Sequence, residues 1–350
     1  MKAAPAGQPN TEAQLQMAEA MLEQRRLDAA QRYFREAEAS GASADRCAAG
    51  RWMIAMLKGD FAAAWQESDA IRARGMPDPH RMWAGENLTD MRVIVRCLHG
   101  FGDTVQFARY AGLLNRKSAT VVWEVPPAML QIMRCFSNIH HVMTWDNEYE
   151  AGRDYDVQVE LMELPYLFRT TSAELPISEK YVRLPHAIVQ RAAAEMGVRT
   201  KPRVGVVWSA GSWNESRSIP YSTFRGTLEV DDCEFWNLQG GPSRNVDAVL
   251  RDAPVCSSGI LCLAGAISQM DLVLTTDTLA AHLAGALGVP IWLMLQHAAD
   301  WRWMVGRDHS PWYPSMRIFR QPRPGAWDEV VGAVTAKLGC WAERMERREA

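Results

Sequence analysis

The sequence predicts an α/β protein with parallel sheets, preceded by a short all-α helical module. From residue 92 onwards, short apolar runs that suit buried strands alternate with helical patterns, which is typical of βαβ units. Before residue 80, the apolar residues recur at helical spacing instead. A chain of 350 residues is long enough for two or three domains. We expect a disordered N-terminus at 1–10, helical repeats at 11–80, and α/β domains at 90–190 and 200–340, the second ending in a C-terminal helix.

The composition argues against several classes of function. The formal charge is -3 and the lysines and arginines are dispersed, so the basic patch of a nucleic-acid-binding protein is missing. No apolar run approaches the ~20 residues that span a bilayer. A signal peptide begins with a basic stretch that leads into an apolar core, and residues 1–10 do not show this pattern. We therefore expect a cytoplasmic protein without a transmembrane segment.

Cysteine, histidine and tryptophan usage bounds the chemistry further. The seven cysteines form no CxxC pair or disulfide framework, so we expect reduced, mostly buried thiols. The eight histidines show no HExxH spacing, and no metal site is expected. Several of the fourteen tryptophans gather near the C-terminus, where they either fill a core or wall a ligand cleft. They include Trp301, Trp303, Trp312 and Trp327.

A repeat is visible in the helical module. Residues 11–39 read as two helices with a break at 24–27, and the same apolar pattern returns at a constant offset of 34 residues. The period resembles that of the tetratricopeptide repeat, with Gly59 at the turn between paired helices. The alternative is a pair of plain helical hairpins with a coincidental period. Because at least about three such repeats are usually needed for stability, we expect the module to pack on the next domain or on another chain.

The most informative segment is 270–295. Its apolar run at 272–274 predicts a buried strand, and the helix formers of 280–287 predict a helix that Gly288 and Pro290 end. In a parallel sheet the N-terminus of such a helix offers unpaired N–H groups to a phosphate, here at Thr278. The alternative is that Asp277 or Thr278 merely caps the helix and that His282 is a partly buried helix residue.

A second loop of this kind follows a predicted strand at 92–98. It carries two glycines and Asp103 before a helix predicted at 105–115. The loop lacks the third glycine of the dinucleotide-binding fingerprint, and Asp103 would repel a pyrophosphate there. Glycines let a ligand approach the backbone, and a carboxylate at the tip of the turn can take a proton from a hydroxyl. The alternative is that Asp103 caps the helix.

The second α/β domain begins with a predicted strand at 203–208. The loop behind it, 209–220, carries one arginine and several neutral polar residues. Arg217 can hold a diphosphate with its planar guanidinium, while Ser209, Ser212 and Asn214 add neutral donors. The alternative is a solvated arginine in a surface loop.

With these loops in order, the chain resembles the glycosyltransferase family 9 of heptosyltransferase-like proteins. The resemblance covers roughly residues 90–340 and is greatest to the bacterial branch with N-terminal tetratricopeptide repeats. It implies a GT-B fold of two facing Rossmann-like domains, an acceptor on the first, a nucleotide-sugar donor on the second, and inverting transfer without a metal. The matching motifs lie at 100–110, 205–211, 217–220, 277–288, and 300–303 with 310–314.

The resemblance also assigns roles to residues. Asp103 matches the aspartate proposed as general base, and the donor motif matches Asp277, Thr278 and His282. Ser209 and Arg217 lie in the loop that contacts the nucleotide or its phosphates. On the acceptor side, the resemblance points to His99, Gly102 and Gln106. The chain departs from the family by having no lysine in the 209–220 loop and Leu279-Ala280 where glycine is common.

The sequence thus predicts an inverting glycosyltransferase that moves a heptose- or hexose-type sugar from a nucleotide-diphosphate sugar to a hydroxyl of a protein or glycan. No cofactor is expected beyond this co-substrate, and the helical module would recruit a protein partner or a second copy of the chain. One alternative is a non-catalytic scaffold with a binding role. A second is an epimerase or hydrolase, which needs a further acid or base such as Glu163 or His99. The nucleotide, the sugar, the acceptor and the oligomeric state stay open.

Overall fold

The computed structural model describes residues 8–75, 82–117, 120–145, 155–176, 180–240, 246–254 and 259–349. The chain forms two compact units. A helical unit combines Met1–Pro79 with Pro165–Leu175 and Ala298–Arg307, and an α/β unit holds the remainder. Both predicted α/β domains fall into this one unit, so their boundaries stay a prediction.

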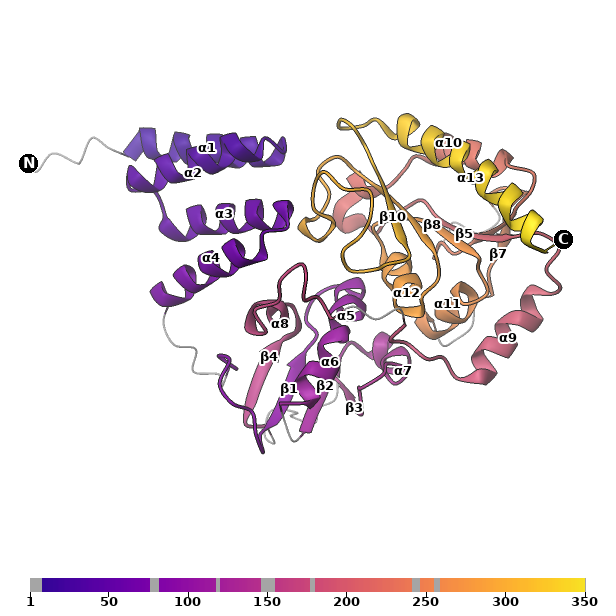
Figure 1. The fold of residues 1–350 in the computed structure, drawn as a ribbon, viewed down its shortest axis with the longest axis horizontal. Coiled ribbons are helices and arrows are strands. Elements are labelled where there is room, and N and C mark those ends of the chain that lie inside the picture. The colour runs from indigo at the N-terminus through magenta and orange to yellow at the C-terminus, as the bar shows by residue number, and fades with distance from the viewer. Residues whose placement is uncertain are drawn as a thin grey trace, which may run out of the picture. The chain divides into compact units, whose positions relative to one another are not determined.

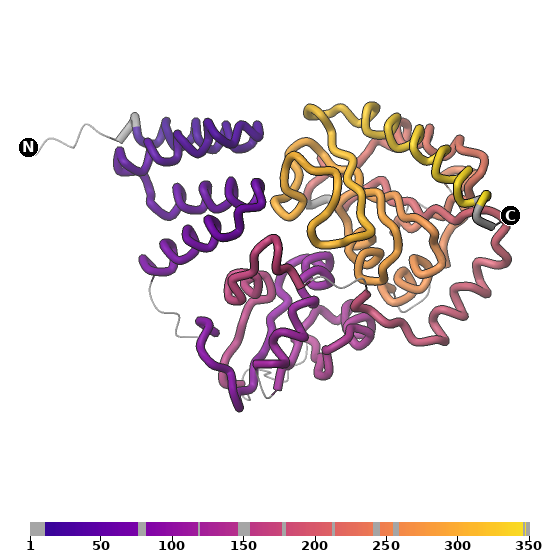
Figure 2. The backbone as a smooth tube through the Cα atoms, viewed as in Figure 1, coloured from indigo at the N-terminus to yellow at the C-terminus, as the bar shows by residue number. Residues whose placement is uncertain are grey.

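Four helices in two antiparallel pairs make up most of the helical unit (Figures 1 and 2). They are α1 (Gln8–Glu23), α2 (Leu27–Ala39), α3 (Ala44–Lys58) and α4 (Phe61–Arg74). The predicted break at 24–27 is confirmed, and α2 and α4 begin 34 residues apart, which is the predicted offset. Residues 1–7 of the predicted disordered segment lie outside the described residues. Helix α1 begins at Gln8, and the predicted disordered segment stays a prediction.

Local sequence explains where these helices begin and how closely they pack. Asp60 caps α4 by accepting a hydrogen bond from the Ala63 N–H at 3.0 Å. Gly59 ends α3 with a φ of 77°, a conformation in which glycine is favoured. Gly50 lets α3 approach α2, because a Cβ at this position would lie 2.2 Å from the Phe34 ring. The two pairs therefore share a core built from small and aromatic side chains.

Two segments far along the chain complete the helical unit. The Trp65 indole donates a hydrogen bond to the Thr170 carbonyl at 2.7 Å, and Arg169 pairs with Asp69 through its two terminal guanidinium nitrogens at 2.7 and 2.8 Å. The second segment contains the short helix η7 (Trp301–Trp303). Trp301 packs edge-on against Trp52 with ring centroids 5.6 Å apart. The side chains of Trp301, Trp303, Trp312 and Trp327 are all buried, so they fill cores.

The α/β unit contains a first parallel sheet of four strands in the order β3-β2-β1-β4 (Figure 1). Its strands are β1 (Arg92–Arg96), β2 (Thr120–Val125), β3 (His141–Thr144) and β4 (Val157–Glu160). The helices between and after them are α5 (Phe101–Phe107), η1 (Ala108–Tyr110), α6 (Ala111–Asn115), η2 (Pro127–Met129), α7 (Leu130–Met133), η4 (Leu161–Glu163) and α9 (His186–Met196). All but the first residue of α8 (Leu164–Leu167) belong to the helical unit.

A second parallel sheet has six strands in the order β10-β9-β8-β5-β6-β7. Its strands are β5 (Arg203–Val207), β6 (Glu234–Asn237), β7 (Arg251–Asp252), β8 (Leu272–Thr276), β9 (Ile291–Leu295) and β10 (Met316–Arg320). The helices are η5 (Ser212–Arg217), α10 (Tyr221–Phe224), η6 (Arg225–Glu229), α11 (Ile260–Ile267), α12 (Leu279–Leu287) and α13 (Trp327–Glu349). Alternate residues of β5, β8 and β9 share one buried cluster with α10 and α13, as expected for a sheet covered by helices.

The strand orders determine where a ligand binds. The second sheet has the order of the Rossmann fold, and the first sheet has the first four strands of that order. In both, the direction of winding reverses beside the first strand, between β1 and β4 and between β5 and β8. Ligands of such sheets bind at the carboxyl ends of the strands at this switch point. The predicted loops at 99–104, 209–220 and 277–278 all follow strands that flank a switch point.

The prediction of reduced cysteines is wrong for Cys262 on α11, which is disulfide-bonded. Cys47, Cys97 and Cys135 are free, buried thiols as expected, whereas the free Cys340 is exposed.

Candidate functional site

The loop after β1 brings Asp103 into the first turn of a helix. Helix α5 begins at Phe101, four residues before its predicted start, because Gly100 takes the extended N-cap conformation. Asp103 is therefore not at the tip of a turn. Its Oδ2 accepts a hydrogen bond from the Gly100 N–H at 3.0 Å, which is the capping role considered as an alternative. The side chain is only partly buried, so capping does not remove the carboxylate from solvent.

Glu160, the last residue of β4, lies beside this loop. Its Oε1 is 3.5 Å from Nε2 of His99, while its Oε2 accepts a hydrogen bond from the Met162 N–H at 2.7 Å. Burial raises the pKa of the Glu160 carboxyl, and the negative charges of Glu163 and Asp103 act in the same direction. Glu160, whose carboxyl has a raised pKa, thus lies near the predicted base at the first switch point.

The donor loop after β8 positions Asp277 and Thr278 at the start of α12. Thr278 is the N-cap of α12 but its side chain makes no capping hydrogen bond; its Oγ1 lies 3.0 Å from Oγ1 of Thr275. The first N–H groups of a helix lack partners within the helix, and the helix dipole adds partial positive charge there. This end of α12 is therefore compatible with an anion, and the role of Thr278 as its binding site stays a prediction.

The loop after β5 reaches the donor loop. Strands β5 and β8 are hydrogen-bonded neighbours, and Arg217 donates from Nη1 to the Asp277 carbonyl at 2.9 Å. Arg217 is partly buried, so it is not the solvated arginine considered as an alternative. Ser209 is held by Gln239, whose Oε1 accepts from the Ser209 N–H at 2.9 Å. The side chain of Ser212 lies outside the described part of the chain.

Helices α5 and α12 pack against each other and bring the two loops together. A Cβ at Gly102 would lie 2.7 Å from Cδ2 of His282, so only glycine permits this approach. His282 is buried; its Nδ1 lies 2.9 Å from the Tyr313 hydroxyl and its Nε2 lies 3.9 Å from Oδ1 of Asp277. The predicted donor histidine therefore also contacts the helix that carries the predicted base.

Gln106 lies on α5, and Arg109 lies on η1, which directly follows α5. Gln106 is fully buried, and its side-chain amide finds no hydrogen-bond partner among the described residues. Arg109 is buried too; it donates to the Trp312 carbonyl at 2.7 Å and to the Tyr181 hydroxyl at 3.2 Å. Its guanidinium carbon lies 4.8 Å from the centre of the Tyr313 ring. A Cβ at Gly102 would face His282 on α12, and the place of Gly102 and Gln106 on the acceptor side stays a prediction.

Sequence reasoning missed three residues of this site. Glu160 is identifiable from its place at the end of a strand beside the switch point, once the strand order is known. Arg109 and Tyr313 lie within the recognised motifs, but only the tertiary structure shows that they contact one another.

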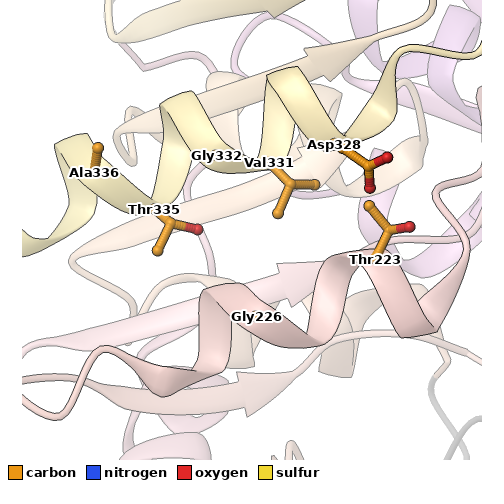
Figure 3. A pocket seen from close by; sticks show the side chains of 7 residues that line it. All are labelled: Thr223, Gly226, Asp328, Val331, Gly332, Thr335 and Ala336. Carbon is orange, nitrogen blue, oxygen red and sulfur yellow. The ribbon is translucent and has the colours of Figure 1, made fainter.

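One groove lies elsewhere, between α10, η6 and α13 (Figure 3). It has a volume of about 490 Å³ and includes none of the predicted site residues. Its lining residues are Thr223, Gly226, Asp328, Val331, Gly332, Thr335 and Ala336. The lining carries one carboxylate and no cation, so it does not suit a diphosphate.

No group of three or more histidine, cysteine, aspartate or glutamate side chains in the described ranges is arranged to hold a metal ion. Within the same ranges, no helix combines the length and the apolar character that crossing a membrane requires.

Comparison with solved structures identifies the fold. The crystal structure of a family 9 glycosyl transferase from Veillonella parvula DSM 2008 matches 67% of this chain and 87% of its own length, with a TM-score of 0.51 and 11% sequence identity. The heptosyltransferase WaaC of E. coli with ADP matches 71% of this chain and 99% of its own, with a TM-score of 0.49 and 13% identity. The first likeness shows a shared α/β fold.

Comparison of sequences gives one curated relative. Protein FlbA of Caulobacter vibrioides is 23% identical over 335 residues, which cover 82% of this chain. The chain spans 54% of the length of FlbA, about half of that protein. No protein-family model matches the chain.

Proposed function

We propose that the chain is an inverting glycosyltransferase without a metal requirement. It would move a heptose- or hexose-type sugar from a nucleoside diphosphate sugar to a hydroxyl of a protein or glycan. One observation carries this proposal. The packing of α5 on α12 brings the loop with Asp103 and the loop with Asp277 and Thr278 together, each at a switch point of its sheet. The shared fold with a family 9 glycosyl transferase supports the same function.

The donor side suits a departing diphosphate. The N-terminus of α12 offers N–H groups and partial positive charge, and the Arg217 guanidinium lies next to it through its hydrogen bond to the Asp277 carbonyl. Both stabilise negative charge that grows on the phosphate oxygens as the glycosyl bond breaks.

The acceptor side would supply the base. The acceptor hydroxyl gives its proton to the Asp103 carboxylate, and its oxygen forms a bond to the anomeric carbon from the face opposite the donor phosphate. The bond between the anomeric carbon and the phosphate oxygen breaks, and its electron pair leaves with the nucleoside diphosphate. The sugar configuration is thereby inverted.

Thermal unfolding of the purified chain with a panel of nucleoside diphosphates tests the proposal. ADP, UDP, GDP, dTDP and CDP are compared with and without EDTA, since a ligand at 100 times its Kd adds about 2.7 kcal/mol of stability. We expect one nucleotide to raise the midpoint and EDTA to leave this shift unchanged. A folded protein that responds to no nucleotide contradicts the transferase and favours the scaffold, in which Asp103 serves only as a cap.

Arg217→Ala provides the matched test of the donor side. We expect the identified nucleotide to bind at least about tenfold more weakly, because a charged hydrogen-bonding group of this kind contributes about 1.5–3 kcal/mol. Arg191→Ala is the control, since Arg191 is exposed on α9 and pairs with Glu195 at 2.6 Å. Equal nucleotide affinity in both variants would remove Arg217 from the donor site.

A further inference from the structure

A row of polar contacts crosses the α/β unit from the donor loop to α5. Each neighbouring pair in the row is close in space, and the row ends on η1, which directly follows the helix that carries Asp103. Its members, in order, are Asp277, His282, Tyr313, Tyr181 and Arg109. Apart from the donor-motif residues Asp277 and His282, none of these side chains has a role in the transfer step described above.

His282 is held from both sides by its ring nitrogens. Nδ1 lies 2.9 Å from the Tyr313 hydroxyl, and Nε2 lies 3.9 Å from Oδ1 of Asp277, at the carboxyl end of β8. Gly102 packs directly against the imidazole ring, because a Cβ at Gly102 would lie 2.7 Å from Cδ2 of His282. The imidazole thus has one orientation, in which Nε2 faces the donor loop.

The hydroxyl protons of the two tyrosines can be assigned from their neighbours. The Tyr181 hydroxyl oxygen lies 3.1 Å from the Val105 carbonyl oxygen and 3.4 Å from the Tyr313 hydroxyl oxygen. The shorter distance favours Val105 as the acceptor of the Tyr181 proton. Burial raises the pKa of Tyr313 well above its ordinary value, so this residue keeps its proton. That proton then has Nδ1 of His282 as its nearest acceptor.

Arg109 fixes the far end of the row. Its Nε donates to the Gln106 carbonyl at 2.8 Å, and its Nη1 donates to the Trp312 carbonyl at 2.7 Å. The Nη2 group donates to the Tyr181 hydroxyl at 3.2 Å, which leaves the Tyr181 proton directed at Val105. Arg109 therefore ties the segment that carries Tyr313 to helix α5.

We propose that Tyr313 is a positioning residue that donates a hydrogen bond to Nδ1 of His282 and so holds this histidine neutral, with its proton on Nε2. The Nε2–H then faces the donor loop as a fixed hydrogen-bond donor for the diphosphate of the nucleotide. The identification of the ligand as the diphosphate of a nucleotide rests on the proposed function. The protonation state of His282 does not, and it can be measured on the free protein.

The first test is nitrogen NMR of the protein labelled with ¹⁵N-histidine, near neutral pH and without nucleotide. The His282 signals are identified by their loss in His282→Asn. We expect a protonated Nε2 and an unprotonated Nδ1 in the wild-type protein. A ring protonated on Nδ1, or on both nitrogens, overturns the proposal, and the wild-type spectrum alone decides this.

The second test is nucleotide binding to Tyr313→Phe, which keeps the ring and removes the hydroxyl. We expect at least a tenfold weaker affinity for the nucleotide found in the thermal panel, with the acceptor KM unchanged. Tyr221→Phe is the control, because the Tyr221 hydroxyl on α10 donates at 3.0 Å to Asp247 in the turn before β7. Equal affinity of Tyr313→Phe and wild type overturns the role of Tyr313. Failure of the wild type to bind any nucleotide instead counts against the proposed function.

Discussion

Asp103 has two roles that a single substitution can separate. Its Oδ2 accepts the Gly100 N–H as a helix cap, whereas the proposed chemistry needs its negative charge. An asparagine oxygen can still accept from that N–H but cannot take a proton from a hydroxyl. The charge and the cap are therefore distinguishable at this position.

We predict that Asp103→Asn lowers the rate of sugar transfer at least about 100-fold, the usual contribution of a general base. Nucleotide affinity and the thermal midpoint should stay close to those of the wild type, because the cap is kept. Transfer is measured with the nucleotide sugar and acceptor, and affinity by calorimetry. Glu195→Gln, on the exposed face of α9, is the control. Undiminished transfer in Asp103→Asn would exclude Asp103 as the base.

Glu160 gives a prediction about pH. Burial raises its pKa in the folded protein above its ordinary value of about 4.3. A carboxyl group whose pKa is raised by folding contributes its full stabilisation at pH values below its pKa in the unfolded chain. This contribution is lost as the pH rises through its pKa in the folded protein. Glutamine cannot ionise, so Glu160→Gln should gain stability relative to the wild type as the pH increases from about 4.

Urea unfolding of both proteins between about pH 4 and 8 measures this difference. We expect the gap between Glu160→Gln and the wild type to widen with pH and then level off above the folded pKa. A difference that stays constant over the whole range would show that Glu160 ionises in the folded protein as it does in the unfolded chain.

At the scale of the site, the sequence predicts the loops but not the pairing of side chains. Asp103, Arg217, Asp277 and Thr278 were recognised because polar residues follow buried strands, a local feature. Glu160 was missed because its relevance depends on which strand lies beside β1, and strand order is not encoded in any one segment. Its pairing with His99 likewise follows from that order.

At the element scale, strands and most helices follow from the apolar pattern, but helix starts do not. The start of α5 was placed four residues late, because Gly100 and Gly102 read as a turn. Gly102 is instead required inside α5, where it leaves room for His282. A glycine needed for close packing looks the same in a sequence as a glycine needed for a turn.

Two glycines inside helices test this distinction. A Cβ at Gly285 on α12 would lie 2.2 Å from the Tyr313 ring, whereas a Cβ at Gly332 on α13 meets no atom within 4 Å. We predict that Gly285→Ala destabilises the protein by about 1–3 kcal/mol through overpacking. Gly332→Ala should stabilise it by up to about 1 kcal/mol, since alanine is the better helix former. Urea unfolding of both variants measures the changes, and equal effects would contradict the close approach at Gly285.

At the scale of the whole molecule, the helical module was predicted as the continuous range 11–80. The structure adds Pro165–Leu175 and Ala298–Arg307 to the same unit. Their partners are single side chains such as Trp52 and Trp65, whose position in a helical pattern shows that they are buried but not what covers them. The sequence could therefore predict the helices of this unit, but not that the two later segments belong to it.

The shared unit predicts that its three segments lose structure together. Trp65 is buried; it hydrogen-bonds to Thr170 and packs on Tyr166 with ring centroids 5.8 Å apart. Trp65→Ala should cost about 3–5 kcal/mol locally. Hydrogen exchange should then accelerate in α3, α4 and both added segments, while β5, β8 and β9 keep their protection. Met17→Ala, an exposed residue of α1, should change none of these rates. Faster exchange throughout the strands as well would show one cooperative structure instead of two units.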